Sequence, residues 1–173
     1  QAEQAKQDMD EGNILKGDLG GNSYEDYVSE NYAALFAFMS LIHPDETQRA
    51  DYAQRSRTLL LHVMNEAAKG SASGQPFRDP EFSINDRSRW YGVSFPLTVD
   101  WIYSTLTTED KILIHKVFSR WIDELSHAEM TTMNHPEPIG VINDPVLTSD
   151  LDAVRWAGNN YYTAHMRNMG MMA

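Results

Sequence analysis

The chain has 173 residues, of which 42% are hydrophobic and 10% aromatic, so its composition is that of one folded domain and excludes a disordered chain. It carries 14 Lys and Arg against 25 Asp and Glu, and the resulting net charge of −11 argues against a nucleic-acid partner, because phosphate binding needs a basic surface. The absence of cysteine excludes disulfide scaffolds, thiol catalysis and cysteine-type zinc sites.

The N-terminal segment, residues 1–22, is polar and interrupted by glycine. We read it as a flexible arm that precedes one helical domain over residues 23–173. The first helix of that domain is expected from about Ser23 to Ile42, with Ser23 as its cap, because apolar residues there recur at helical spacing.

The middle of the chain predicts two further helices separated by a long loop. Pro44 begins the second helix, where a missing backbone N–H costs nothing, and Gly70 ends it. Residues 70–83 are rich in Gly, Ser and Pro, and loops of this length are often functional. The third helix is expected from about Asp86 to Leu106, with a kink at Pro96.

The last part of the chain predicts two more helices. Thr107 and Asp110 in "TTED" form a capping box that begins the fourth helix. Residues 129–148 contain three prolines and read as irregular, and a final helix begins near Gly158. Alternating strand patterns are almost absent, so we expect an all-α fold of antiparallel helix pairs joined by long loops.

The sequence contains no motif of a metal or phosphate site. The histidines are scattered, HExxH and EF-hand patterns are absent, and "GDLGGN" lacks the strand and the Lys-Ser/Thr ending of a phosphate loop. The acids of "NDPVLTSDLD" read as a loop with a helix cap. We therefore expect no cofactor and no metal, and the lack of an apolar run of about 18 residues predicts no membrane span.

The stretch "NDRSRWYG" places Arg87 and Arg89 beside Trp90 and Tyr91, where the long loop enters a helix. Such a combination can hold a sugar acid, because a guanidinium forks onto a carboxylate and a flat ring stacks on the sugar. The alternative is a helix start with surface arginines and two anchoring aromatic residues.

The closing stretch "WAGNNYYTAHMRNMGMMA" carries polar groups on two neighbouring helical stripes. The first stripe holds Trp156, Asn160, Thr163 and Arg167, and the second holds Tyr161, His165 and Asn168. The methionines are expected to face the core. Lys and Glu, the usual residues of a solvent face, are missing, which favours a site wall. The alternative is that Asn160 caps a helix or binds backbone.

A family resemblance rests on these segments. "RSRWYGVSFPLTVDWIYSTLTTEDKILIHKVFSRWIDEL" resembles the helical-toroid half of heparinase II/III-like and alginate-lyase-like polysaccharide lyases, where a helix ending in Asp-Trp-Leu/Ile-Tyr precedes "LT-x-E-[ED]" and a helix ending near "W-x-x-EL". "NNYYTAHMRNMGMMA" is similar to the family's Asn-rich segment. The resemblance covers roughly residues 30–173. It implies an incomplete (α/α) toroid in a secreted or periplasmic bacterial protein that binds an acidic polysaccharide.

The chemistry implied by the resemblance is β-elimination. Asn160 or Asn159 would neutralise the uronate carboxylate, and Tyr161 and His165 would move protons, because amide and hydroxyl donors stabilise a developing enolate. Some relatives place His directly after the two Asn, where this chain has Tyr161. Trp156, Asn160 and Arg167 would line a groove, with Tyr161 and His165 beside it and Arg89 and Trp90 nearby; the substrate-binding residues would be Arg89, Trp90, Trp156 and Arg167. The general base is implied beyond Ala173, so this chain alone is expected to have little or no eliminase activity.

Three other functions stay open. The chain could be a non-catalytic helical toroid that binds glycan or protein, or an unrelated helical protein. It could also be another toroid enzyme, such as a glycoside hydrolase, which needs two carboxylates across a bond; Asp100 and Glu124 are acids of the helices.

Overall fold

The computed structural model describes residues 1–14, 28–126 and 160–173, except for the side chain of Tyr162. Over these ranges every regular element is helical and no strand occurs, so the predicted all-α class is confirmed. The α-helices are α1 (Ala2–Asp10), α3 (Ser29–Ile42), α4 (Glu46–Ala67), α5 (Asp86–Tyr91), α6 (Ser94–Trp101), α7 (Thr108–Ser126) and α10 (Asn160–Met172). Two short 3-10 helices are η1 (Phe82–Ile84) and η2 (Tyr103–Thr105).

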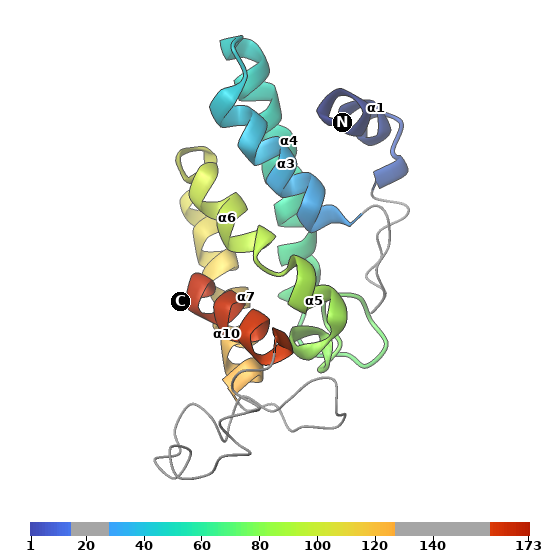
Figure 1. The fold of residues 1–173 in the computed structure, drawn as a ribbon, viewed down its shortest axis with the longest axis vertical. Helices are drawn as coiled ribbons and strands as arrows, with labels where there is room; N and C mark the ends of the chain where they lie inside the picture. The colour runs from blue at the N-terminus through green and yellow to red at the C-terminus, as the bar shows by residue number, and fades with distance from the viewer. Residues whose placement is uncertain (15–27, 127–159) are drawn as a thin grey trace.

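Helices α3 and α4 form a long antiparallel pair (Figure 1). The turn between them is short, and Asp45 caps α4, since its carboxylate accepts a hydrogen bond from the Gln48 N–H at 2.9 Å. Pro44 thus lies one residue before the cap and does not begin the helix as expected. The described part of α3 begins at Ser29, and the predicted cap Ser23 lies outside the described residues.

The expected long third helix is two helices, which corrects its boundaries. α5 ends at Tyr91, Gly92 is its C-cap, and α6 begins at Ser94. Pro96 lies in the first turn of α6, so the break precedes the proline. A proline ring clashes with the carbonyl four residues earlier, here that of Gly92, and this clash disfavours an unbroken helix through this point.

The capping box of α7 is confirmed. The Asp110 N–H donates to the Thr107 hydroxyl at 3.2 Å, and the Thr107 N–H donates to the Asp110 carboxylate at 2.9 Å. The same carboxylate receives two hydrogen bonds from the Arg57 guanidinium, at 2.7 and 3.0 Å, which tie α4 to α7. Burial alone would raise the pKa of Asp110, but these hydrogen bonds outweigh it and lower that pKa below its usual value.

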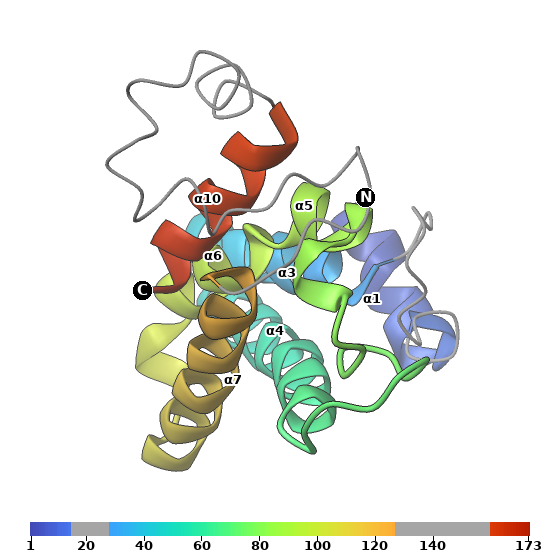
Figure 2. The same cartoon turned by 90° about the horizontal axis from the view of Figure 1, so that it is seen from below.

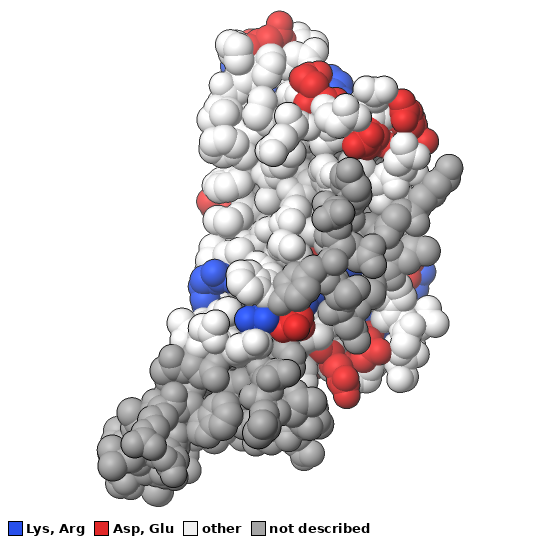
Figure 3. Space-filling model, turned by 45° about the vertical axis from the view of Figure 1, so that its right-hand side comes forward, with Lys and Arg blue, Asp and Glu red and all other residues white. Residues whose placement is uncertain are grey.

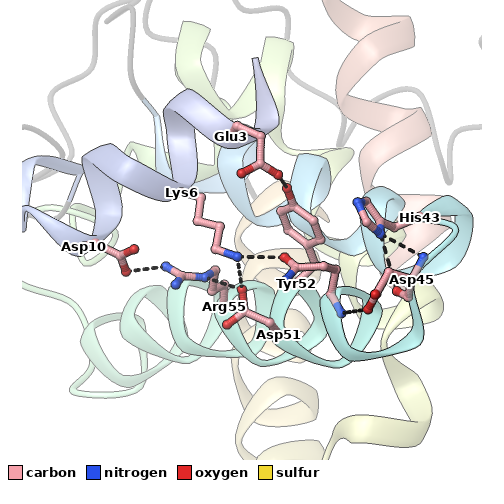
Figure 4. A network of polar contacts seen from close by, with 9 residues as sticks. Glu3, Lys6, Asp10, His43, Asp45, Asp51, Tyr52 and Arg55 are labelled. Atoms are coloured by element: carbon pink, nitrogen blue, oxygen red, sulfur yellow. Dashed lines mark hydrogen bonds and ion pairs between the residues drawn. The ribbon is translucent and has the colours of Figure 1, made fainter.

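Helix α1 lies within the segment read as a flexible arm. It packs Ala5 against α3 and α4, in a small core that also contains Phe36 and Tyr52. Figure 4 shows a polar network between α1 and α4. Its contacts are Lys6 with Asp51 (2.7 Å), Arg55 with Asp10 (2.7 Å) and the Tyr52 hydroxyl with the Glu3 carboxylate. The polar residues of this N-terminal segment therefore form a helix, and charged contacts hold that helix against α4.

The main core lies between α4, α6 and α7 and is closed by the loop around Phe77. Trp121 of α7 stands at its centre, with the Phe95 and Phe82 rings 5.3 and 5.4 Å from it. Helix α10 packs across α6 and α7 and beside α5, although it is far from α5 in the sequence (Figure 2). The fold thus brings the two segments that carry the predicted site residues together.

Candidate functional site

The α5–α10 junction is the place where predicted site residues meet. The Arg89 guanidinium lies 3.6 Å from the centre of the Tyr161 ring and 4.9 Å from that of Trp90. The Arg167 guanidinium of α10 donates to the Arg89 carbonyl at 3.4 Å. Residues more than 70 positions apart therefore share one surface. Trp156, predicted to join them, lies outside the described residues.

Arg89 has a structural role in this junction. Its side chain is buried, and its guanidinium donates two hydrogen bonds to the Asp86 carboxylate, at 2.6 and 3.1 Å. Its charge is therefore balanced within α5, and its flat face holds the Trp90 and Tyr161 rings by cation–π contact. The expectation that Arg89 binds a substrate carboxylate directly does not fit this arrangement.

Arg167 is the exposed cation of the junction. Its guanidinium donates to the Asn168 side-chain carbonyl at 3.0 and 3.2 Å and to the Arg89 backbone carbonyl, all neutral acceptors. Within the described part of the chain it has no carboxylate partner. The Trp90 side chain, from the residue that follows the Arg89 carbonyl bound by Arg167, is 54% exposed.

Asn168 anchors α10 on α5, a role that the sequence did not reveal. Its side chain is buried and donates to the Ser88 carbonyl at 2.7 Å, which also accepts from the Gly92 N–H at 2.8 Å, and to the Arg89 carbonyl at 3.4 Å. A Cβ added at Gly92 would lie 2.8 Å from the Asn168 amide nitrogen, so this approach needs glycine. In the sequence, the only indication of this role is that Asn168 lies on the same helical stripe as His165.

The exposed and buried faces of α10 are partly the reverse of those expected. The stripe of Tyr161, His165 and Asn168 faces the protein, and His165 is only 2% exposed. Met171, expected in the core, is 40% exposed, whereas Met172 packs against the main core. The polar stripe of α10 is therefore the one that packs against the protein, because Asn168 finds a backbone acceptor on α5.

The three predicted catalytic residues do not share one open surface. Asn160 is exposed at the start of α10, Tyr161 is partly covered beneath Arg89, and His165 is buried. A proton-transfer group must reach the substrate directly or through one water. From its described position His165 does not reach a polymer bound at the surface.

Arg87, the second arginine of the "NDRSRWYG" stretch, is a core residue. It is fully buried and donates to both oxygens of the equally buried Glu30 carboxylate, each at 2.7 Å. Its guanidinium also lies 4.8 Å from the centre of the Phe77 ring. It therefore joins α5 to α3 and takes no part in an open site.

The acids considered for a hydrolase lie in different surroundings. Burial raises the pKa of Glu124 even though Arg120, which donates to its carboxylate at 2.6 Å, acts in the opposite direction. Arg120 also donates to the Ala67 carbonyl at 2.8 Å, so this pair fastens α7 to the end of α4. Asp100 is exposed and lines a groove between α6 and α7, which Glu124 does not line.

Residues 1–14, 28–126 and 160–173 contain neither a metal-binding cluster nor a membrane-spanning helix. Among them, no group of three or more His, Asp or Glu side chains is arranged to hold a metal ion. None of the described helices combines the length and the apolar character that crossing a bilayer requires. Comparisons of the chain with protein-family models, with curated proteins and with solved structures gave no match.

Proposed function

We propose that this chain is the helical, glycan-binding part of a polysaccharide lyase that acts on uronic-acid polymers, and that it binds without cleaving. The observation that carries the proposal is the exposed Trp90 side chain next in sequence to the Arg89 carbonyl that Arg167 binds, Arg167 being a cation bound only to neutral acceptors among the described residues. The antiparallel α3–α4 pair is compatible with part of an (α/α) toroid, and a secreted or periplasmic location belongs to the same proposal.

The two side chains suit the two parts of a uronate unit. An open indole face stacks on the apolar face of a sugar ring, and a guanidinium forks onto its carboxylate. Arg89 supports the indole from one side, which limits the freedom that Trp90 loses on binding. The overall charge of −11 opposes a polyanion, so recognition has to depend on this local cation.

We assign the elimination reaction itself to a larger protein of which this chain is a part. Asn160 is exposed on α10 and is available as a donor to a uronate carboxylate, whereas the burial of His165 supports no proton transfer by that ring from this position. We therefore expect no rise in unsaturated-uronate absorbance when this chain alone is incubated with alginate, heparan sulfate or hyaluronan. Robust turnover would contradict a binding role without cleavage.

The binding prediction is tested with Trp90→Ala and Arg167→Gln. Each change should weaken binding of alginate oligosaccharides about tenfold or more, because a hydrogen bond to a charged group contributes about 1.5–3 kcal/mol and a stacked ring a comparable amount. Isothermal titration measures the affinity, with neutral maltooligosaccharides as the reference ligand.

The matched controls are Arg49→Gln and Phe38→Ala. Arg49 also donates only to backbone carbonyls among the described residues, at 2.9 and 3.3 Å, but at the start of α4, and Phe38 is an exposed ring on α3. Both controls should bind like the parent. If the controls lost as much affinity as the test variants, or if Trp90→Ala and Arg167→Gln lost none, the α5–α10 junction would not be the glycan-binding site.

The alternative is a domain that binds a protein. It is favoured by three exposed apolar side chains near the end of α3, Phe38, Leu41 and Ile42. Under that alternative the parent does not bind oligosaccharides at all, so the same titration separates the two functions.

A further inference from the structure

A groove of about 450 Å³ lies between α6 and α7, and its lining includes none of the junction residues Arg89, Trp90, Tyr161 and Arg167. Its volume is within the range of roughly 300–1,000 Å³ that is typical of small-molecule sites. Pro96 and Val99 of α6 and Ile114 and Phe118 of α7 supply apolar walls. The exposed end of α10 closes one end of the groove with two methionines, whose flexible side chains adapt to a ligand.

The polar residues gather toward the other end of the groove. Asp100 and Tyr103 stand at the end of α6 and just after it, and Lys111 stands in the first turns of α7. Because the chain turns between α6 and α7, these residues come from the turn end of the hairpin, whereas Pro96 and Phe118 come from the opposite end. The two charged side chains therefore lie at one end of the groove and most apolar ones at the other, and His115 of α7 also lines it.

The two opposite charges of the groove are not paired with each other. The Lys111 ammonium lies 3.8 Å from the centre of the Tyr103 ring, which holds it by cation–π contact. Neither Asp100 nor Lys111 takes part in an ion pair with a residue that the structure describes. One negative and one positive group thus face the same space, each with room for a partner from a ligand.

We propose that this groove binds a small zwitterion with an apolar body, namely a short apolar peptide with free termini. Its ammonium group binds Asp100, its carboxylate binds Lys111, and its side chains fill the space between Pro96, Phe118 and Met172. An anionic ligand would bring its charge close to Asp100, and a cationic ligand would bring its charge close to Lys111. A ligand with both charges matches both groups.

Solvation of the two charges is the competing explanation, because exposed charges on a protein surface often have no partner and contribute little. Under that explanation, a ligand gains only from the apolar walls, and blocking its termini leaves its affinity unchanged. The two explanations therefore differ in how binding depends on the ligand's own charges.

The experiment titrates the protein with the dipeptide leucyl-phenylalanine and follows its methionine methyl signals by NMR. The signals of Met171 and Met172 should shift, while that of Met64, fully buried and not lining the groove, should not. Acetylating the dipeptide's amino group or amidating its carboxylate should weaken binding about tenfold, the size expected for one charged hydrogen bond.

Two variants and two controls assign the charges to residues. Asp100→Asn should remove the preference for a free amino group, and Lys111→Met should remove the preference for a free carboxylate. Glu109→Gln and Lys116→Met change an exposed carboxylate and an exposed ammonium of α7 that do not line the groove, and both should bind like the parent. Equal affinity for free and blocked dipeptides, or no shift at Met171 and Met172, would overturn the proposal.

Discussion

The Glu30–Arg87 pair is the contact at which a single residue matters most for stability. Both side chains are fully buried, and two hydrogen bonds of 2.7 Å join them between α3 and α5. Removing two charges from water costs several kcal/mol each, and only a well-formed pair offsets that cost. The pair therefore makes each partner depend on the other.

Replacing Arg87 alone should be strongly destabilising. Arg87→Met leaves the Glu30 carboxylate buried without its cation, and we expect a loss of about 3–5 kcal/mol in the free energy of unfolding, measured by urea denaturation. The double variant Glu30→Met with Arg87→Met should recover most of that loss. Lys69→Met, which breaks the exposed pair with Glu66, should cost less than about 1 kcal/mol. Similar losses for Lys69→Met and Arg87→Met would contradict this account.

At the scale of one element, α1 is held by ionisable groups in addition to its small apolar core. Burial by itself would raise the pKa of Asp51, but hydrogen bonds from Lys6 and Arg55 lower it below its usual 3.8. Burial, together with the hydrogen bond to Glu3, raises the pKa of Tyr52 from 10.0 to about 12. Asp51 therefore contributes stability that is lost as pH falls below about 4, and Tyr52 contributes stability that is lost as pH rises from about 10 to 12.

We expect α1 to separate from α4 at both extremes of pH while the main core stays folded. Amide hydrogen exchange of Ala2–Asp10, corrected for the intrinsic rate, should be slow near pH 7 and should quicken near pH 3 and above pH 11. The Arg55→Met variant should reproduce the rapid exchange at neutral pH, because it removes the contacts with Asp10 and Asp51. Unchanged protection of α1 at pH 3 would refute the electrostatic account.

At the scale of the whole molecule, the excess of acidic residues should make stability depend on salt. On the face shown in Figure 3, acidic side chains form several patches and basic ones are fewer. Because the net charge is −11, the acidic side chains repel one another in the compact state. Salt at 0.1 M screens this repulsion beyond a distance of about 10 Å. We expect Tm to rise by several degrees between low and physiological ionic strength, as measured by circular dichroism. A falling Tm would mean that the close ion pairs outweigh the long-range repulsion.

Local signals predicted the elements but not their partners. The all-α class and the Thr107–Asp110 capping box were predicted because helical spacing and caps act within a few residues. The division of the third helix was missed, since a proline acts on the carbonyl four residues before it and the break therefore falls upstream.

The residues of the site show why its chemistry was harder to predict. Sequence spacing correctly placed Tyr161, His165 and Asn168 on one stripe but gave no indication that this stripe is the buried one. Arg87 and Arg89 have the same local context, yet one binds Glu30 inside the core and the other binds Asp86 at the junction. Burial depends on which distant helix covers a side chain, and no local pattern contains that information.

The anchoring of α5 by Asn168 has a consequence for the order of folding. α5 has six residues, and isolated helices shorter than about 12–15 residues are marginal in water. Part of its anchoring comes from a donor 80 positions later in the chain, so α5 gains that stability only after the loop between them has closed. The α3–α4 hairpin needs only neighbouring residues and can form early, whereas α5 is anchored late and leaves the ribosome well before Asn168 has been synthesised.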